Sequence, residues 1–104
     1  MKAVIQSAFG APSEVLRVAD VPAEAPDSDE VVIRMEAAAM HIADLRTIAG
    51  DPSFQFPLPR SPGFEGIGEV VRIGSAVTAF HAGDRVFPGL GSGTFREEVR
   101  CKAE

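Results

Sequence analysis

Apolar and polar positions alternate along residues 30–40, and this is the clearest pattern in the chain. One alternating set is Val31, Ile33 and Met35. The other is Val32, Arg34 and Glu36. Because successive side chains of a strand point to opposite faces of its sheet, this period predicts a strand with one buried face.

Further strands are expected in the stretch from residue 61 to 88, where glycines recur between short apolar runs. Glycine in strand-rich sequence marks turns, bulges or close backbone contacts, so the stretch predicts turn, strand, turn and strand. Its first strand covers residues 68–74, which are rich in β-branched side chains. Gly83 and Asp84 form the turn before the next strand, and a last strand is expected over residues 94–101.

The first part of the chain predicts a hairpin, because residues 2–7 and 14–21 have strand composition and are separated by glycine and proline. An acidic, proline-bearing surface loop follows at residues 22–30, with residues 27–30 facing water. Residues 51–62 contain four prolines and therefore predict a long irregular loop, whose apolar side chains pack against the domain.

Only one segment has a helical period. Ile42, Leu45 and Ile48 are spaced by three residues, and Gly50 follows them as a helix-ending residue. The pattern as a whole predicts a mainly β, mostly antiparallel domain with one short helix near residues 41–49.

Composition limits the classes of function. A chain of 104 residues, 45% hydrophobic, suits one globular domain over residues 1–104 and leaves no room for a second. The formal charge of −5 without a basic stripe argues against nucleic acid as a partner, and no apolar run is long enough to span a membrane. A strand-like start without a signal or transit peptide, together with the single cysteine Cys101, predicts a cytoplasmic protein.

Two familiar motifs are incomplete in this chain. Gly89, Gly91 and Gly93 imitate part of a dinucleotide-binding fingerprint, but a strand rather than a helix is expected after them. The metal-ligating residue types are scattered, so no metal site is predicted. His81 is interpreted as an exposed surface residue, and Cys101 as a small packing group.

His41 and Glu65 are the two residues whose position suggests chemistry. His41 lies where a strand passes into a helix, close to Asp44, and a histidine there binds a ligand, transfers a proton or caps the helix. Glu65 lies in a glycine-rich bend, where a carboxylate accepts backbone hydrogen bonds or faces a site. The residues alone leave these alternatives open.

Three pieces of the sequence carry a resemblance to a known family. They are MKAV with FGAPSEVLRV, then EVVIRMEAAAMHIADL, and above all PGFEGIGEVVRIGSAVTAFHAGDRV. In this order they resemble the N-terminal domain of the medium-chain dehydrogenases/reductases. The resemblance covers nearly the whole chain and implies a GroES-like, partly open β-barrel. It also implies that the Rossmann cofactor domain of such enzymes is absent from this chain.

The resemblance implies chemistry without zinc. Zinc-dependent members have a cysteine ligand at the position of His41 and a histidine ligand at that of Phe64, followed by a glutamate that Glu65 matches. Their proton relay starts at a hydroxyl residue where this chain has Ala43. The four cysteines of their structural zinc lobe are missing here.

What remains resembles the zinc-free branch, in which NADPH gives a hydride to an activated alkene such as a quinone, an enone or a 2-enoyl thioester. The tail FPGLGSGTFREE is similar to that of mitochondrial-type 2-enoyl thioester reductases, with Phe95 and Arg96 in the matching arrangement. Those reductases use a catalytic tyrosine in the loop matched by residues 51–56, and this chain contains no tyrosine.

Site roles follow from the resemblance as expectations. His41 is the candidate proton donor, with water as the alternative, and Asp44 and Glu65 are expected to orient the site. The candidate walls of the alkene pocket, which core packing also explains, are Phe54, Phe56 and Phe64.

The full-length protein is expected to be a homodimer that acts on a small activated alkene, and the 104-residue chain alone is expected to be inactive. The rival interpretation is a non-enzymatic GroES-like module for interaction, of the co-chaperonin type. That interpretation needs a mobile loop that grips a partner, and residues 51–62 are the loop long enough to serve.

Overall fold

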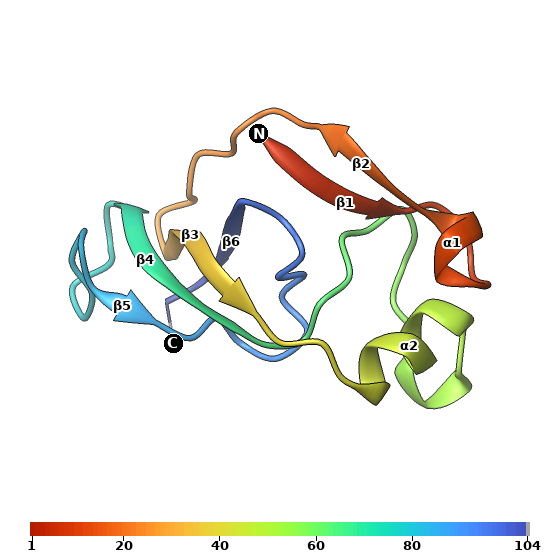
Figure 1. Cartoon of the computed structure of the whole chain (residues 1–104). Coiled ribbons are helices and arrows are strands. Elements are labelled where there is room, and N and C mark those ends of the chain that lie inside the picture. The colour runs from red at the N-terminus through yellow and green to blue at the C-terminus, as the bar shows by residue number, and fades with distance from the viewer. Residues whose placement is uncertain (104) are drawn as a thin grey trace.

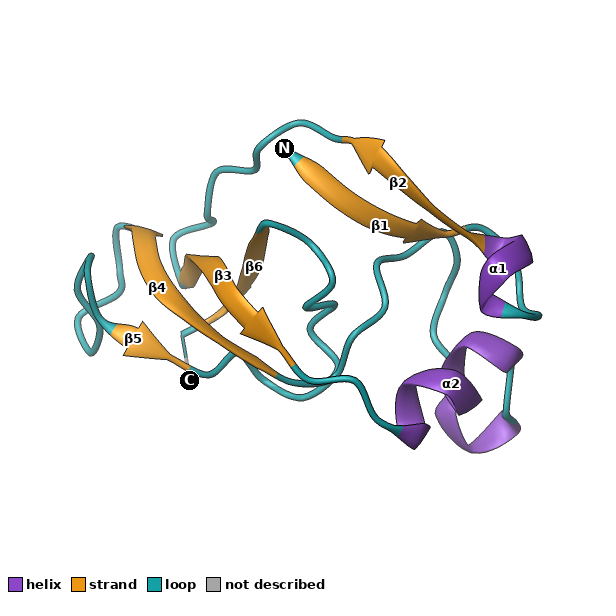
Figure 2. Ribbon diagram, in the orientation of Figure 1, coloured by secondary structure: helices purple, strands orange, loops and turns teal. Residues whose placement is uncertain are grey.

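A computed structural model describes residues 1–103, except for the side chain of Phe54, and contains two antiparallel sheets (Figures 1 and 2). One sheet is the hairpin of β1 and β2, and the other has the strand order β5-β4-β3-β6. The elements in chain order are β1 (Lys2–Gln6), α1 (Pro12–Val15), β2 (Leu16–Asp20), β3 (Glu30–Ala38), α2 (Ile42–Ala49), the 3₁₀ turn η1 (Pro52–Phe54), β4 (Gly66–Ile73), β5 (Arg85–Val86) and β6 (Glu98–Lys102).

The hairpin is joined to the larger sheet without closing a barrel. The amide of Val4 donates to the carbonyl of Phe95 at 2.9 Å, just before β6. At the far end of β1, Gln6 and Arg60 exchange two backbone hydrogen bonds of 2.7 and 3.1 Å. The arrangement is the partly open, GroES-like β-barrel that the sequence predicted.

The core lies on one face of the larger sheet, where Val31, Ile33 and Val70 form its buried centre. Met35 and Cys101 are among the partly buried residues that pack against this centre, so the prediction that Cys101 is a packing group is confirmed.

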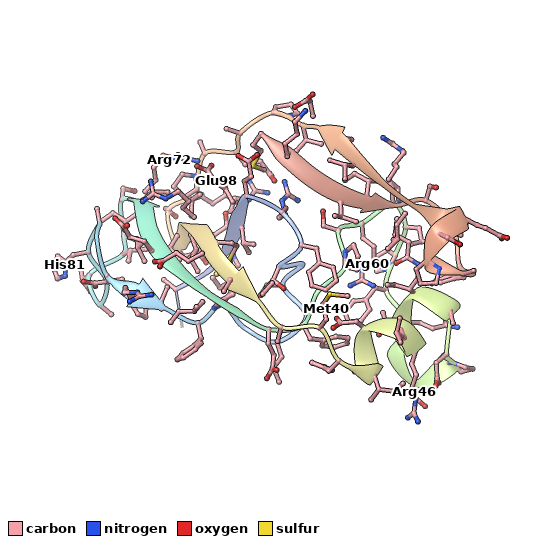
Figure 3. All side chains as sticks on the ribbon, viewed as in Figure 1. Met40, Arg46, Arg60, Arg72, His81 and Glu98 are labelled. Atoms are coloured by element: carbon pink, nitrogen blue, oxygen red, sulfur yellow. The ribbon has the colours of Figure 1, made fainter. Side chains whose placement is uncertain are left out.

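The prediction of a single buried face on β3 is wrong for the first half of the strand, because Val32 is only 1% exposed. Val32 pairs with Arg72 on β4 and with Arg100 on β6, so the three side chains share one face. The guanidinium groups of both arginines donate to carbonyls of residues 24 and 25 in the loop after β2. This loop, beside which Figure 3 labels Arg72, covers the second face.

Glu30 was expected to face water and is instead 9% exposed. It is the first residue of β3, its Oε1 accepts a hydrogen bond of 2.9 Å from the amide of Asp27, and the same oxygen lies 3.4 Å from Nε of Arg100. Residues 27–29 are exposed, as predicted.

Two strands begin later than predicted, and the number of helices differs. Pro12 starts a helical turn, α1, in which the amides of residues 14 and 15 donate to the carbonyl of Ala11, so β2 begins only at Leu16. The strand expected from residue 94 begins at Glu98, because residues 93–95 bond instead to the backbone of residues 62 and 63. The structure therefore has two helices and a 3₁₀ turn where one helix was predicted.

The helix predicted near residues 41–49 is confirmed as α2. His41 is its N-cap, and Gly50 ends it with a φ of 91°, the left-handed conformation that glycine adopts most easily. Within residues 1–103 no helix has the length and apolar character needed to cross a membrane.

Candidate functional site

The register of β3 and β4 brings the two suspected chemical residues together. Ala38, at the end of β3, pairs with Gly66, at the start of β4. His41 follows the first by three residues and Glu65 precedes the second by one, so both lie at the same end of the sheet. The amide of Ala39 donates to the carbonyl of Glu65 at 3.1 Å and fixes this junction.

Side chains of the junction form a small cluster around the imidazole. His41 Nε2 lies 3.5 Å from Glu65 Oε2, and the imidazole ring is 5.8 Å from the ring of Phe64. Phe56 meets Phe64 edge to face at 6.0 Å between ring centroids. The His41 side chain is 36% exposed, so a half-buried imidazole beside a carboxylate and an aromatic ring is available to exchange a proton with a bound molecule.

Asp44 holds the backbone of His41 in place. Its Oδ2 accepts a hydrogen bond of 3.0 Å from the amide of His41, while its own amide donates to the carbonyl of His41 at 3.0 Å. The carboxylate is only 4% exposed and sits in the first turn of α2, where negative charge favours the helix. The candidate site and the start of α2 are therefore one unit.

Arg60 belongs to this cluster and was missed at the sequence level. Its guanidinium carbon lies 4.4 Å from the centroid of the Phe56 ring, a cation–π arrangement. Burial lowers the pKa of the Arg60 guanidinium, and the nearby Asp44 carboxylate opposes that shift. Figure 3 shows Arg60 between the β1–β2 hairpin and α2. An arginine in a proline-rich loop gave no signal of this position, because the loop has no regular period and Asp44 lies in a different element.

The glycine-rich segment before β6 holds the bend that carries Phe64 and Glu65. The hydroxyl of Thr94 donates to the carbonyl of Glu65 at 2.9 Å, and the amide of Gly91 donates to the carbonyl of Phe64 at 3.2 Å. Gly63 has a φ of 116°, and a Cβ at that position would meet Thr94. The glycines of residues 89–93 thus support a bend, and the loop interpretation of that segment is confirmed.

An apolar groove of about 520 Å³ runs beside Glu65. Its most exposed walls are Phe87 and Leu90, whose side chains are 79% and 78% exposed. Neither was identified from the sequence, although two large apolar residues in a proline and glycine turn are a usable signal. Phe64 borders His41, Phe56 borders Phe64, and neither lines this groove, while the side chain of Phe54 lies outside the described part of the chain.

The remaining candidates lie apart from the cluster. His81 is 80% exposed and sits in the turn before β5, and Figure 3 shows it at the end of the molecule opposite Arg46 on α2. Burial raises the pKa of the Cys101 thiol, which keeps that group protonated within the core. Among residues 1–103, no three His, Cys, Asp or Glu side chains come together as a metal site.

Comparisons with known proteins show which family has a similar sequence and fold. The family described as the alcohol dehydrogenase GroES-like domain matches residues 27–104. The mitochondrial enoyl-[acyl-carrier-protein] reductase of Arabidopsis thaliana is 34% identical over 99 residues, which are 94% of this chain and 26% of that protein. A chloroplastic quinone-oxidoreductase homolog of Spinacia oleracea is 34% identical over 90% of this chain and 29% of its own length.

Solved structures of quinone oxidoreductases are similar to this chain as well. A quinone oxidoreductase of Pseudomonas syringae superimposes with a TM-score of 0.84 and 35% identity, over 97% of this chain and 31% of that one. The quinone oxidoreductase of Escherichia coli, complexed with NADPH, has a TM-score of 0.84 and 27% identity, over 99% of this chain and 31% of that one. The chain spans about a quarter of the length of the curated relatives it matches.

Proposed function

Because this chain belongs to the alcohol dehydrogenase GroES-like domain family, we propose that it is the substrate-side domain of an NADPH-dependent oxidoreductase. The proposed reaction delivers a hydride to an activated C=C bond of a quinone, an enone or a 2-enoyl thioester. The observation that carries the proposal is the cluster at the end of β3 and β4, where the imidazole of His41 lies between the Phe64 ring and the Glu65 carboxylate.

The dinucleotide itself does not fit residues 1–103. A pyrophosphate site of the fingerprint type needs a helix directly after its glycines, and here the strand β6 follows Gly93. We therefore assign the cofactor to a domain outside these residues. When bound there, NADPH supplies the hydride, and this chain supplies the substrate side of the cleft.

Chemistry without zinc is part of the proposal. A catalytic zinc takes three protein ligands, but among residues 1–103 no three His, Cys, Asp or Glu side chains come together, and Phe64 presents carbon atoms where the zinc-dependent members present a ligand. This donor set does not fit the metal, and no step of the proposed reaction uses one.

The chain's own residues have distinct roles in this proposal. Once the hydride has been added to the substrate, His41 donates a proton from its imidazole to the resulting anion, with water as the alternative donor. Asp44 keeps His41 at the N-cap through the 3.0 Å backbone hydrogen bond, and Glu65 faces Nε2. Phe56 and Phe64 form an apolar wall that excludes water from the reacting bond.

The test uses the full-length protein and follows NADPH consumption with a quinone, an enone and an enoyl thioester between pH 5 and 9. General acid catalysis contributes on the order of 10²-fold or more, so His41→Ala should lower kcat by about that factor with an altered pH profile. His81→Ala is the matched control, because that histidine is exposed and remote from the cluster. An unchanged rate in His41→Ala across this pH range would assign the proton to water.

The isolated chain is expected to show no turnover and no measurable NADPH affinity. Calorimetric titration of the 104-residue chain with NADPH is the direct test, and a saturable signal would contradict the assignment of the cofactor to another domain.

Cytoplasmic localisation and a homodimeric full-length protein stay predictions.

The co-chaperonin-type alternative needs residues 51–62 to be a free gripping loop. In the structure this segment contains η1, Arg60 ties it to β1 through two backbone hydrogen bonds, and Phe56 meets Phe64 edge to face. These contacts favour the reductase. The exposed side chains of Phe87 and Leu90 are the observation that keeps an interaction role as the second candidate.

A further inference from the structure

A second cavity, of about 330 Å³, opens on the hairpin side of the molecule. Its lining residues come from β1, β2, the segments that follow β2 and lead to β4, and the segment before β6, and none of them lines the groove beside Glu65. None of the residues His41, Asp44, Phe64 and Glu65 lines it. The family assignment and the proposed reaction give it no role.

The register of the strands explains why polar donors meet in this cavity. Arg17 on β2 pairs with Ile5 on β1, and Arg96 bridges to Ala3 on the other side of β1. Directly opposed residues share a face, and so do residues two apart, so both arginines lie on one face of β1. The backbone of Arg60 pairs with Gln6, so the next residue, Ser61, lies on the same face of β1 as Ile5. Ser61 also lines the cavity.

Several of these donors have no partner within the described part of the chain. The hydroxyl of Ser61 is unpaired although the residue is only 8% exposed, and Nε of Arg96 is buried and unpaired. The exposed side chain of Arg17 makes no hydrogen bond or ion pair with residues 1–103. Buried donors without acceptors are costly, so these groups form a built site for an acceptor. Arg60 also borders the cavity, and its Nη1 and Nη2 are likewise buried without a hydrogen-bond partner, but its guanidinium lies over the Phe56 ring.

The charges around the cavity select a monoanion. Arg96 is already paired with Glu24 at 3.3 Å, and the acidic rim residue Asp20 is paired with Lys2 at 2.9 Å. Of the lining cations described, Arg17 is the exposed one without an ion pair, whereas the guanidinium of Arg60 lies over the Phe56 ring and has the Asp44 carboxylate near it. A carboxylate matches this balance better than a phosphate dianion, and the aliphatic walls, which include Ile5 and Val21, suit a short carbon chain.

We propose that this cavity binds the carboxylate of a small amphipathic acid. The carboxylate accepts hydrogen bonds from the Arg17 guanidinium, Arg96 Nε and the Ser61 hydroxyl, and the alkyl chain packs on Ile5 and Val21. The site is separate from the proposed reductase cleft, so its occupancy is independent of cofactor and of turnover.

The test is titration of the 104-residue chain with hexanoate, followed by amide NMR shifts. Saturable shifts are expected at Arg17, Ser61 and Arg96. Hexanamide, a neutral isostere, should bind at least about tenfold more weakly, because a hydrogen bond to a charged group contributes more than one to a neutral group. Equal binding of the two compounds, or tighter binding of inorganic phosphate than of hexanoate, would overturn the assignment.

Substitutions of the lining residues test whether hexanoate binds in this cavity. Arg17→Gln should weaken hexanoate binding at least about fivefold and leave the fold intact, because its exposed side chain has no partner among residues 1–103. Ser61→Ala should weaken it as well. Arg85→Gln is the matched control, since Arg85 is an exposed arginine on β5 that pairs with Glu36 and does not line the cavity. Equal effects of Arg17→Gln and Arg85→Gln would show that hexanoate binds by general charge attraction, which contradicts the proposal.

Discussion

At the scale of single residues, Asp44 connects the candidate chemistry to the stability of α2. Its carboxylate accepts from the amide of His41, one of the helix-start donors that an intrahelical bond cannot satisfy. The same carboxylate lies near the buried guanidinium of Arg60 and raises that group's pKa against the effect of burial. One acidic side chain therefore positions the candidate proton donor and compensates a buried cation.

Asp44→Ala should lower the free energy of unfolding by about 1–2 kcal/mol, because it removes this capping acceptor and leaves the Arg60 charge uncompensated. Asp44→Asn keeps an acceptor oxygen and should lose less. Urea denaturation followed by circular dichroism measures both. Glu14→Ala is the control, since Glu14 is an exposed acid in the first turn of α1. Equal stabilities of Asp44→Ala and the unmodified chain would show that the cap is not needed.

At the scale of elements, the ends of α2 are as well defined as its interior. The helix has only eight residues, a length at which an isolated helix is unstable in water. Its buried residues Asp44, Thr47 and Ile48 fix it against the hairpin, where Gln6 Nε2 donates to the carbonyl of Ile48 at 3.0 Å. The C-cap Gly50 allows the chain to turn back into the proline-rich loop.

Gly50→Ala should lower the free energy of unfolding by about 1–2 kcal/mol, because an L residue is strained in the left-handed conformation. A Cβ there would also lie 3.0 Å from the Phe9 side chain. Gly89→Ala is the matched control, since it has no left-handed φ and its nearest neighbour would be 3.6 Å away. Thermal and urea unfolding compare the two. A cost for Gly89→Ala as large as that for Gly50→Ala would contradict the argument from conformation.

At the scale of the whole molecule, stability depends on a small hydrophobic core that lies beside a cavity. Val31, Ile33 and Val70 are at most 3% exposed, yet they also line a cavity of about 460 Å³ between β5 and β6. A chain of this size has a limited number of such residues, so each one carries a large share of the total stability.

Ile33→Ala should lower the free energy of unfolding by about 2–5 kcal/mol, the range for truncation of a buried isoleucine. Ile73→Ala removes the same atoms from the end of β4, where the side chain is 39% exposed, and should cost much less. Denaturant midpoints of the two variants give the difference. Similar midpoints would mean that Ile33 is effectively in contact with solvent through the cavity that it lines.

How far the sequence predicts the structure depends on the range of the interactions involved. The hairpin, the core face of β3, α2 and its glycine end follow from local period and turn chemistry, and all of them are confirmed. Three predictions were wrong: a single buried face on β3, a solvent-exposed Glu30, and a last strand that begins at residue 94. Each depends on residues distant in the chain: Arg72 and Arg100 hold the loop over the second face of β3, Arg100 lies beside Glu30, and residues 62–63 bond to the segment before β6.

The same division applies to the candidate site. The sequence by itself determined that His41 and Glu65 stand at a strand end and in a glycine-rich bend, and that Phe64 cannot ligate a metal. Only the tertiary structure decided that they meet, because the β3–β4 register places His41 Nε2 3.5 Å from Glu65. It alone also gathered Arg17, Ser61 and Arg96 around one cavity, since sheet pairing joins residues that no local period connects.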